Sequence, residues 1–399
     1  MVERPPRRRV VVTGLGSLSG PTVGAEELWT ALTAPDPAPT FRELVGFDPR
    51  RWMDRRHVQR TARFSQLAVV AGRLAHADAG EPTDDPERVA VVMGTGNGGV
   101  ADLIKGYLDL QEHGPGGVSL LLGAIAMSNG GSANLAFALG SKGPTYSVAS
   151  GCASGTHAVV DGFRLVRDGL ADVAYAGGSE AGLMPEGDDP LTAGLRNLRV
   201  HTEESVARPF DLDRQGFVYA EGAGVLRLEP LDAAVARGAR IYAEVLGGAN
   251  TADAHDLIHP APRGEGLARC VRLALAEAGV APHEVGQVNC HGTGTKFNDQ
   301  AESDAAEDVF GRPGPPLTST KAVTGHPGAA AGGLEAVALA LSIDRKLIPQ
   351  TQWSVAPDPE ITADVVRGEP RPWTPGIAIS SSVGLGGQNG TVVMGPAPA

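Results

Sequence analysis

The sequence has few cysteines, and they are not spaced like a disulfide framework. Its 399 residues include three cysteines, Cys152, Cys270 and Cys290, with no CxxC pair among them. An odd number without paired spacing argues against a set of disulfides and against a structural zinc site. It favours a reducing compartment, and we therefore expect a cytoplasmic protein that holds no metal.

Long apolar runs are also missing. No stretch approaches the roughly 18 consecutive apolar residues of a membrane-spanning helix. The segment 118–127 is too short, and the region around Leu339 is interrupted by Glu335. A basic N-terminus precedes the apolar run at 10–12, but a secretory signal needs a longer apolar stretch and a cleavage site. We expect neither a transmembrane helix nor a signal peptide.

There is no excess of basic residues. With 34 Lys and Arg against 46 Asp and Glu, the net charge is −12, which argues against a nucleic-acid partner. One local basic run stands out, made of Arg50, Arg51, Arg55, Arg56, Arg60 and Arg63. Two interpretations of this run remain open, a solvated helix face and a docking site for an acidic partner.

What is present is an alternation of strand-like and helix-like segments. Hydrophobic residues make up 42% of the chain, which excludes disorder, and the alternation predicts an α/β fold. Strands are predicted at 10–12, 89–92, 173–176, 242–246 and 377–380. Helices are predicted at 62–79, 153–167, 266–278 and 328–343. Loops are predicted at 33–40, 183–194 and 354–375.

The order of these segments repeats. The helix end at 74–80 resembles that at 273–279, and a valine that begins a strand follows each at the same interval. Each of these strands leads to a Gly-Thr-Gly, and further on each half has a Gly-Pro, a short strand and a small-residue turn. One turn contains Cys152 and the other His326. Matched features in the same order predict an internal duplication with its boundary near 235–240.

The turn around Cys152 is a candidate nucleophile site. The stretch SVASGCASGTH ends a predicted strand and begins a predicted helix, and small residues leave room for a substrate. A helix N-terminus favours thiolate over thiol, and its free N–H groups can stabilise an oxyanion. The residues alone leave an inert buried cysteine as an equal alternative.

A second polar cluster is CHGTGTKFNDQAE. His291 follows a predicted strand, with Gly-Thr-Gly leaving open space ahead of it. The hydroxyls of Thr293 and Thr295 can bind an amide-bearing arm. Asp299 and Glu302 are three residues apart and share a face if a helix has begun there. Asp299 is also a candidate helix N-cap.

The third and fourth clusters lie nearer the C-terminus. In STKAVTGHPG, Lys321 is five residues before His326, and we expect this cation to lie near the imidazole and favour its neutral form. The stretch SSSVGLGGQNG is a glycine-rich loop. Its composition fits a flexible gate or a hairpin turn equally well.

Together these motifs resemble the β-ketoacyl-acyl carrier protein synthases. The resemblance rests on the Cys152 turn, HGTGTKFND, STKAVTGH and GLGGQN in this order, with RPFDLDRQGF and the opening VVTGLG in support. It covers nearly the whole chain. It implies a thiolase-like α/β fold of two similar halves in layers of helices and sheets, usually dimeric. The halves would be 1–237, with the nucleophile, and 238–399, with two catalytic histidines.

The resemblance also implies the reacting groups. Cys152 would accept an acyl chain from the phosphopantetheine arm of an acyl carrier protein as a thioester. His291 and His326 would assist decarboxylation of a malonyl extender and stabilise the enolate. Lys321 would support this network beside His326. The backbone N–H groups of Cys152 and Leu385 would form the oxyanion hole.

Further roles follow from the same resemblance. Thr293 and Thr295 would contact the pantetheine, and Asp299 and Glu302 would support the site structurally. The implied partners are an acyl carrier protein that docks on the basic run, and either an identical subunit or a related chain-length-factor subunit. No permanently bound cofactor, metal, nucleic acid or membrane is implied.

Some residues depart from the family pattern. Leu385 stands where the family has an aromatic gatekeeper, Val383 replaces the preceding aromatic, and Gln215 replaces an acid. The resemblance therefore does not settle gating or acyl size. Four positions are closer to type II polyketide ketosynthases than to the fatty-acid enzymes: Gly151, Lys296, Asn298 and Asp299.

The main hypothesis is a ketosynthase that performs decarboxylative Claisen condensation in type II polyketide biosynthesis. Three alternatives remain. One is a 3-oxoacyl-acyl carrier protein synthase that elongates fatty acids. Another is a non-catalytic subunit of the chain-length-factor type, which typically lacks the cysteine that is present here. The last is a thiolase-like acyltransferase that works without decarboxylation, although thiolases usually pair one histidine with a second cysteine.

Overall fold

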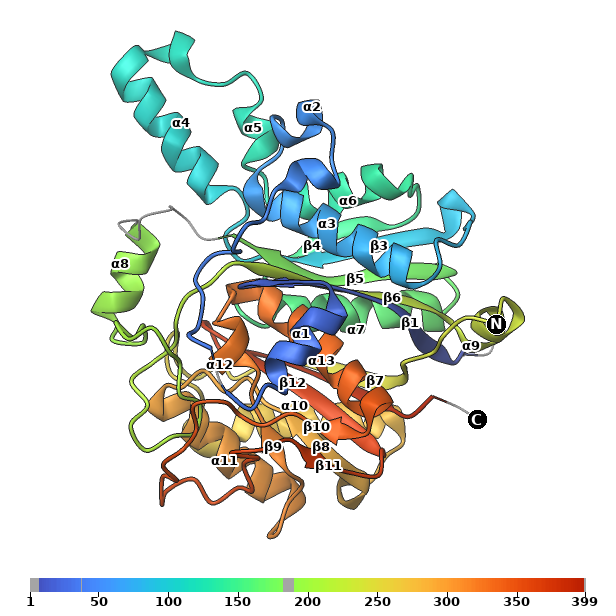
Figure 1. The fold of residues 1–399 in the computed structure, drawn as a ribbon, viewed down its shortest axis with the longest axis vertical. Coiled ribbons are helices and arrows are strands. Elements are labelled where there is room, and N and C mark those ends of the chain that lie inside the picture. Colours follow the sequence, from blue (N-terminus) through green and yellow to red (C-terminus); the bar gives the residue numbers. More distant parts are fainter. Residues whose placement is uncertain (1–6, 37, 182–189, 398–399) are drawn as a thin grey trace.

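The computed structural model describes residues 7–36, 38–181 and 190–397. A mixed eleven-stranded sheet runs through these residues, and helices cover it (Figure 1). Its strands are β1 Val10–Ser19, β2 Thr22–Val23, β3 Val89–Gly94, β4 Thr145–Val148, β5 Val173–Glu180, β6 Gly222–Pro230, β7 Ala243–Ala252, β8 Val285–Asn289, β9 Leu317–Thr318, β12 Ile377–Gly384 and β13 Gln388–Gly395. A separate pair is formed by β10 Leu347–Ile348 and β11 Arg371–Pro372.

The strand order is the same in both halves of the sheet. The path is β4-β3-β5-β6-β1-β7-β13-β12-β8-β9, with β2 beside β1. Outward from the central antiparallel pair β1–β7, each half has two antiparallel pairings followed by two parallel ones. Strand β4 of one half therefore corresponds to β9 of the other, and β3 corresponds to β8.

The helices repeat in the same way. Helices α3 Arg63–Asp78, α6 Gly130–Leu139 and α7 Ser154–Arg167 follow β1, β3 and β4, whereas α10 Glu265–Ala278, α11 Lys296–Phe310 and α13 Ala331–Arg345 follow β7, β8 and β9. The predicted duplication and the thiolase-like α/β class are thus present in the structure. The division at 237/238 stays a prediction, and it falls between α9 Leu231–Ala236 and β7.

The two central helices lie between the halves of the sheet. Helices α7 and α13 pack against each other and against strands of both halves, while α3 and α6 lie outside one half and α10 and α11 outside the other (Figure 1). Small residues allow this contact. A Cβ at Gly333 of α13 would lie 2.2 Å from the Gly224 carbonyl oxygen of β6. Because interiors are close-packed, only glycine permits the backbones to approach so closely.

The remaining helices are short or peripheral. Helix α4 projects from the body at one end of the molecule, with α5 beside it (Figure 1). These helices are α1 Ala25–Leu32, α2 Arg55–Val58, α4 Val100–His113, α5 Leu122–Ile125, α8 Pro190–Asn197 and α12 Lys321–Thr324. The 3-10 turns are η1 Pro49–Arg51, η2 Pro86–Arg88, η3 Pro115–Gly117, η4 Pro262–Gly264, η5 Pro282–Glu284 and η6 Gly328–Ala330.

The predicted strands and helices are all found, with shifted boundaries. The strand expected at 10–12 extends to Ser19, because its small residues fit beneath α3, and the helix expected at 328–343 begins as η6. Two predicted loops are wrong in part: of 183–194, residues 190–194 belong to α8 and 183–189 lie outside the described residues, and of 354–375, residues 371–372 form β11. Within the described ranges no helix is both long and apolar enough to cross a membrane.

Candidate active site

A cavity of about 950 Å³ reaches from the surface to Cys152 and His326. Its walls come from four separated segments, 198–217, 258–260, 291–298 and 383–387. Strand ends from both halves meet at its floor: Cys152 follows β4 of one half, and His291 and His326 follow β8 and β9 of the other. Because these strands belong to the two halves of the duplicated sheet, neither half alone builds the floor.

Cys152 lies in a tight turn just before α7. Gly151 adopts φ +58°, and a Cβ there would lie 3.0 Å from the Leu385 carbonyl oxygen, so glycine suits this position. The expectation that the helix N-terminus makes this thiol acidic is wrong. Burial raises the pKa of Cys152 to about 11, although the Lys321 charge and the Leu385 N–H act in the opposite direction. At neutral pH the free thiol keeps its proton.

The two histidines converge on the cysteine. Sγ of Cys152 and one nitrogen from each of His291 and His326 all lie within 4.8 Å of one another. The rings meet edge to face, with centroids 5.1 Å apart and planes at 84°. Burial lowers the pKa of both histidines well below the ordinary value, and the Lys321 charge lowers them further. Both imidazoles are therefore neutral at neutral pH.

Lys321 contacts His291 rather than His326, which corrects the expected placement. Its Nζ lies 3.1 Å from Nδ1 of His291 and also donates to the His291 carbonyl oxygen. An ammonium group can only donate, so Nδ1 of His291 accepts, and the ring proton is on Nε2. His291 therefore presents an N–H donor toward the cavity. The neutral state expected for His326 is present, with burial as the larger cause.

Glu335 of α13 was not identified as a site residue from the sequence. Its carboxylate forms a buried ion pair with Nζ of Lys321 and accepts a hydrogen bond from Ser382 at 3.2 Å. Both members of the pair are buried. The sequence feature that could have identified Glu335 is an acidic residue within a predicted helix that is otherwise apolar.

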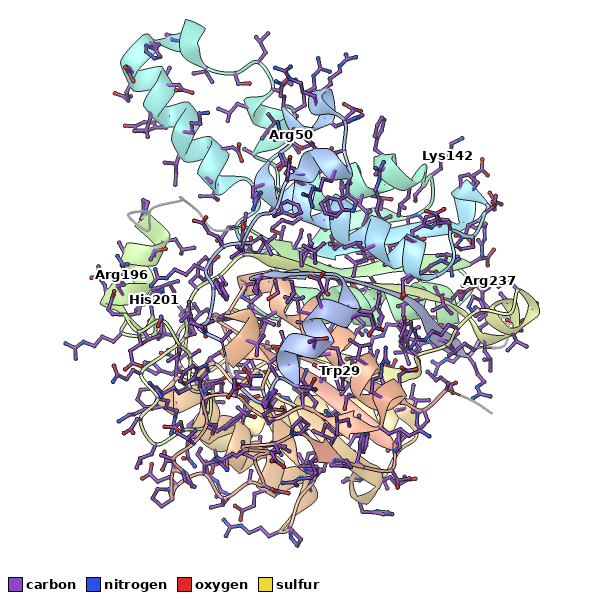
Figure 2. All side chains as sticks on the ribbon, in the orientation of Figure 1. Trp29, Arg50, Lys142, Arg196, His201 and Arg237 are labelled. Carbon is purple, nitrogen blue, oxygen red and sulfur yellow. The ribbon has the colours of Figure 1, made fainter. Side chains whose placement is uncertain are left out.

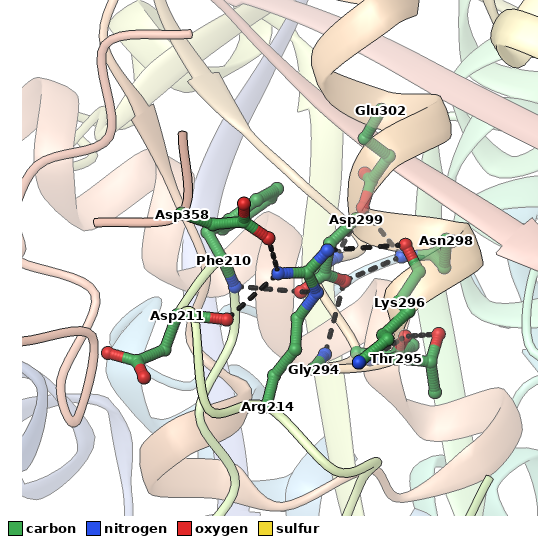
Figure 3. A network of polar contacts seen from close by, with 12 residues as sticks. Phe210, Asp211, Arg214, Gly294, Thr295, Lys296, Asn298, Asp299, Glu302 and Asp358 are labelled. Carbon is green, nitrogen blue, oxygen red and sulfur yellow. Dashed lines mark hydrogen bonds and ion pairs between the residues drawn. The ribbon is translucent and has the colours of Figure 1, made fainter. Parts of the chain in front are cut away.

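Glu302 and Asp299 hold the loop that follows His291 (Figure 3). Both lie on one face of α11, as expected. Glu302 accepts from the N–H groups of His291 and Gly292 at 2.7 and 2.6 Å. Burial and the neighbouring Asp299 raise the pKa of Glu302 to about 8. The N-cap interpretation of Asp299 is wrong, because Thr295 is the N-cap of α11.

Asp299 instead ties this loop to the 210–214 segment. It accepts from the N–H groups of Phe210 at 2.7 Å and of Gly294 at 3.1 Å, and its carboxylate faces Arg214. Arg214 is buried and also pairs with Asp358 (Figure 3). The role of this arginine was missed, because its acidic partners are far apart in the sequence.

The hydroxyls of Thr293 and Thr295 are 2.9 Å apart, and both residues line the same cavity as His291. Polar groups on the cavity wall can bind an amide-bearing arm that enters from outside. Phe297, at the start of α11, also lines the wall and is 68% exposed, so the entrance is partly apolar.

The glycine-rich loop is a hairpin turn between β12 and β13, where Gly384 pairs with Gln388. It lies directly against the nucleophile turn, since a Cβ at Gly384 would be 2.9 Å from the Ser150 carbonyl oxygen. The Leu385 N–H is directed at the sulfur of Cys152. Leu385 itself is 43% exposed and lines the cavity together with Val383 and Gln215.

Cys152, His291 and His326 form the group of described Cys, His and acidic residues whose ligand atoms are close enough to hold a metal ion. A resident metal would occupy the sulfur and nitrogen atoms that face the cavity. The same atoms suit nucleophilic attack and proton transfer. Lys321, which is paired with Glu335, orients the Nε2–H of His291 as a hydrogen-bond donor.

Within the part of the chain that the structure describes, two members of the basic run form ion pairs, and the others do not. Arg63 pairs with the buried Glu221 at 2.7 Å, and Arg50, labelled in Figure 2, pairs with Asp48 at 2.8 Å. The other members are exposed, and none has an ion-pair partner among the described residues. They are Arg51, Arg55, Arg56 and Arg60, on and around α2.

Comparisons with known proteins show the family. The model of the beta-ketoacyl synthase N-terminal domain matches residues 38–234, and that of the C-terminal domain matches residues 242–353. Two curated relatives are named 3-oxoacyl-[acyl-carrier-protein] synthase 2. The Synechocystis protein is 36% identical over 97% of both chains, and that of Staphylococcus aureus strain N315 is 36% identical over 97% of this chain and 98% of its own.

Solved structures share the fold over almost the whole chain. The ishigamide ketosynthase/chain length factor has a TM-score of 0.92 at 34% identity, covering 98% of this chain and all of its own. A type II polyketide acyl-carrier protein in complex with its ketosynthase bound to a hexaketide has a TM-score of 0.87 at 28% identity, with the same coverage.

A duplicated α/β sheet around two central helices, with a cysteine after a strand of one half and two histidines after strands of the other, defines a thiolase-like condensing enzyme. Such an enzyme transfers acyl groups through a cysteine thioester. The chain belongs to the β-ketoacyl synthase family.

Proposed function

We propose that this chain condenses an acyl group held on Cys152 with the two-carbon unit released by decarboxylation of malonyl-acyl carrier protein. One observation carries the proposal: Cys152, His291 and His326 converge within 4.8 Å at the floor of a cavity of about 950 Å³. The cysteine supplies a nucleophile, and two neutral imidazoles supply proton acceptors or donors without a fixed charge.

The first step is acyl transfer. The sulfur of Cys152 attacks the thioester carbonyl of the acyl carrier protein, and its proton passes to a neighbouring neutral imidazole. The carbonyl oxygen takes up negative charge between the N–H groups of Cys152 and Leu385. The tetrahedral intermediate then collapses. The carrier thiolate leaves and is protonated, and the acyl group remains on Cys152.

The second step forms the carbon–carbon bond. The C–CO₂⁻ bond of the malonyl thioester breaks, CO₂ leaves, and the electron pair moves toward the thioester oxygen as an enolate. The Nε2–H of His291 faces this oxygen, since Lys321 fixes the tautomer, and His326 lies beside it. The enolate carbon attacks the acyl carbonyl, and the Cys152 thiolate leaves and takes up a proton.

The carrier arm enters through the cavity. We propose that Thr293 and Thr295 bind its amides, while Asp299 and Glu302 keep their loop in place. The walls and floor suit a flexible, amide-bearing arm such as phosphopantetheine, and the proposed reaction needs no permanently bound cofactor. Three thiols without disulfide partners and a nucleophilic cysteine suit a reducing compartment, and we propose that the protein is cytoplasmic.

Two pathways fit this reaction. We propose type II polyketide synthesis, which is supported by the TM-score of 0.92 with the ishigamide ketosynthase/chain length factor. The smaller Leu385 and Val383 beside Cys152 leave more space than aromatic residues would, as a long polar chain requires. Fatty-acid elongation is the second candidate, favoured by the names of the curated relatives at 36% identity.

The condensation assay tests the reaction directly. With acyl- and malonyl-acyl carrier proteins, we expect one CO₂ released for each 3-oxoacyl product, since both come from the same step. Repeated extension of one chain indicates the polyketide pathway, and a single extension indicates fatty-acid elongation. Acyl transfer that continues without CO₂ release would contradict condensation and favour the thiolase-like alternative.

We also propose that the protein works as a dimer with an identical or a related chain. Strand β4 is the last strand on one side of the described sheet, and its Tyr146 is 37% exposed. Apolar side chains are exposed on and around the projecting α4 and on α6, which packs against β4. They are Leu103, Tyr107, Leu108, Leu120 and Phe137. A sheet edge flanked by apolar residues is typical of an interface.

The exposed arginines around α2 are the proposed docking site for the acidic carrier protein. Arg199 adds a positive charge at the cavity wall. We expect the double variant Arg55→Glu/Arg60→Glu to raise the Kd for the carrier protein about tenfold at low salt, because like charges now face each other, with a smaller effect at high salt. Binding titrations at two salt concentrations measure it.

The matched control is Arg269→Glu/Arg272→Glu on α10, which makes the same charge change on the outer layer of the other half. We expect its Kd to stay within twofold of the wild type. An unchanged Kd in the α2 variant at low salt, or an equal rise in both variants, would contradict docking at α2.

A further inference from the structure

We propose that His157 is a positioning residue that holds the loop carrying Leu385 against the Cys152 turn and so keeps the oxyanion hole closed. The inference rests on the proposed function, because it concerns where the two oxyanion donors lie. His157 is in the second turn of α7, five residues after the nucleophile, and its side chain is buried.

His157 connects the two segments directly. Its Nδ1 lies 2.8 Å from the hydroxyl of Ser150, which is two residues before Cys152. Its Nε2 lies 3.0 Å from the carbonyl oxygen of Asn389, which follows the glycine-rich turn. The ring therefore spans from the nucleophile turn to the base of the hairpin that presents Leu385.

The partners determine the state of the ring. A carbonyl oxygen can only accept, so Nε2 of His157 carries the proton and donates to Asn389. The neutral ring then accepts at Nδ1 from the Ser150 hydroxyl. Burial lowers the pKa of His157, in agreement with a neutral ring, and Asp161 and Arg164 on the same helix face it with opposite charges.

The hairpin has one further side-chain hydrogen bond to α7, between the hydroxyls of Ser382 in β12 and Thr156, 2.7 Å apart, whereas His157 bonds to β13. Asn389 is held from outside by Asp253, which accepts from its side-chain amide, and the Gly386 N–H donates to the Leu257 carbonyl at 2.8 Å. These contacts join the loop to the 253–257 segment and not to α7. His157 also packs against the hairpin, since a Cβ at Gly390 would lie 2.8 Å from its ring.

Loss of the His157 bridge should slow only those reactions that pass through an oxyanion. Removing one oxyanion donor typically costs about a hundredfold to a thousandfold in rate. A hairpin released by loss of the His157 bridge moves the Leu385 N–H but leaves the Cys152 N–H and Lys321 in place. Acyl transfer to Cys152 should therefore fall, whereas alkylation of the thiol, which forms no oxyanion, should change little.

The test compares wild type, His157→Leu and His157→Gln in the intact protein. The amide of Gln reaches the position of Nε2 and can donate to Asn389, whereas Leu cannot. We expect His157→Leu to slow single-turnover acylation by acyl-acyl carrier protein about tenfold to hundredfold with KM within twofold. Its rate of alkylation by iodoacetamide should fall at most threefold, since Lys321 still stabilises the thiolate. His157→Gln should regain most of the acylation rate.

The control is His76→Ala, which removes a half-buried histidine bonded to Tyr175 at 2.7 Å on the outer helix α3. It should acylate like the wild type. Equal losses of acylation and alkylation in His157→Leu, or a His157→Gln variant as slow as His157→Leu, would overturn the proposal. If the wild-type enzyme is not acylated, the proposed function fails. If the wild type is acylated but the His157 variants do not differ as expected, only the role of His157 fails.

Discussion

The Cys152→Ala variant forms no acyl-enzyme, and its condensation rate falls at least about a thousandfold. The reason is chemical: no other thiol reaches the cavity, since Cys270 and Cys290 are buried in the core of the C-terminal half. The fold is expected to persist, because the turn around Cys152 is made of small residues. Thermal unfolding together with the condensation assay measures both effects.

Two further variants sharpen this prediction. Cys152→Gln places an amide where the acyl thioester would be, and we expect malonyl decarboxylation to continue or to increase while condensation is lost. Cys270→Ala, which removes a buried thiol far from the cavity, should keep normal acylation. Condensation by Cys152→Ala would refute the assignment of the nucleophile, and loss of decarboxylation in every Cys152 variant would count against the roles of His291 and His326.

Replacing Lys321 by Met lowers the free energy of unfolding by about 3–5 kcal/mol, because it leaves the Glu335 carboxylate buried without its partner. It also frees Nδ1 of His291, so decarboxylation should fall about a hundredfold. Chemical denaturation and a malonyl decarboxylation assay measure the two effects. Arg371→Met, which breaks an exposed ion pair with Asp364, should cost no more than about 1 kcal/mol.

The loss of stability depends on pH with a definite sign. Burial raises the pKa of Glu335 above its ordinary value of 4.5, and removal of the Lys321 charge raises it further. Above pH 4.5 the unfolded chain is ionised at this residue while the folded variant favours the proton. The unfolding free energy of Lys321→Met therefore falls as pH rises from about 4.5.

A second substitution separates stability from catalysis. In Lys321→Met/Glu335→Gln the buried charge is removed as well, so we expect most of the stability to return while decarboxylation stays low. Recovery of decarboxylation in this double variant would show that Lys321 acts only through the fold.

The fold and the three central residues could be predicted because both depend on the order of features along the chain. The repeat of helix, strand and turn foretold two equivalent halves, and the order of Cys152, His291 and His326 matched a known family. Contacts across the two halves were not predictable. Lys321 is five residues from His326, yet it begins α12 and points to the end of β8, where His291 lies.

Charge states were the least predictable property. The N-terminus of α7 argues for an acidic Cys152, but burial by both halves dominates and raises the pKa to about 11. Asp299 reads locally as an N-cap, whereas α11 begins three residues earlier and buries it against Phe210. In both cases tertiary packing outweighs a local rule that is otherwise sound.

The central claim is that Cys152 carries the growing chain, and mass spectrometry of the intact enzyme tests it most directly. After incubation with hexanoyl-acyl carrier protein, we predict one added hexanoyl group, found on the peptide that contains Cys152. Malonyl-acyl carrier protein should then remove it and yield a 3-oxoacyl product. A hexanoyl group on any other residue, or one that malonyl-acyl carrier protein leaves in place, would contradict the account.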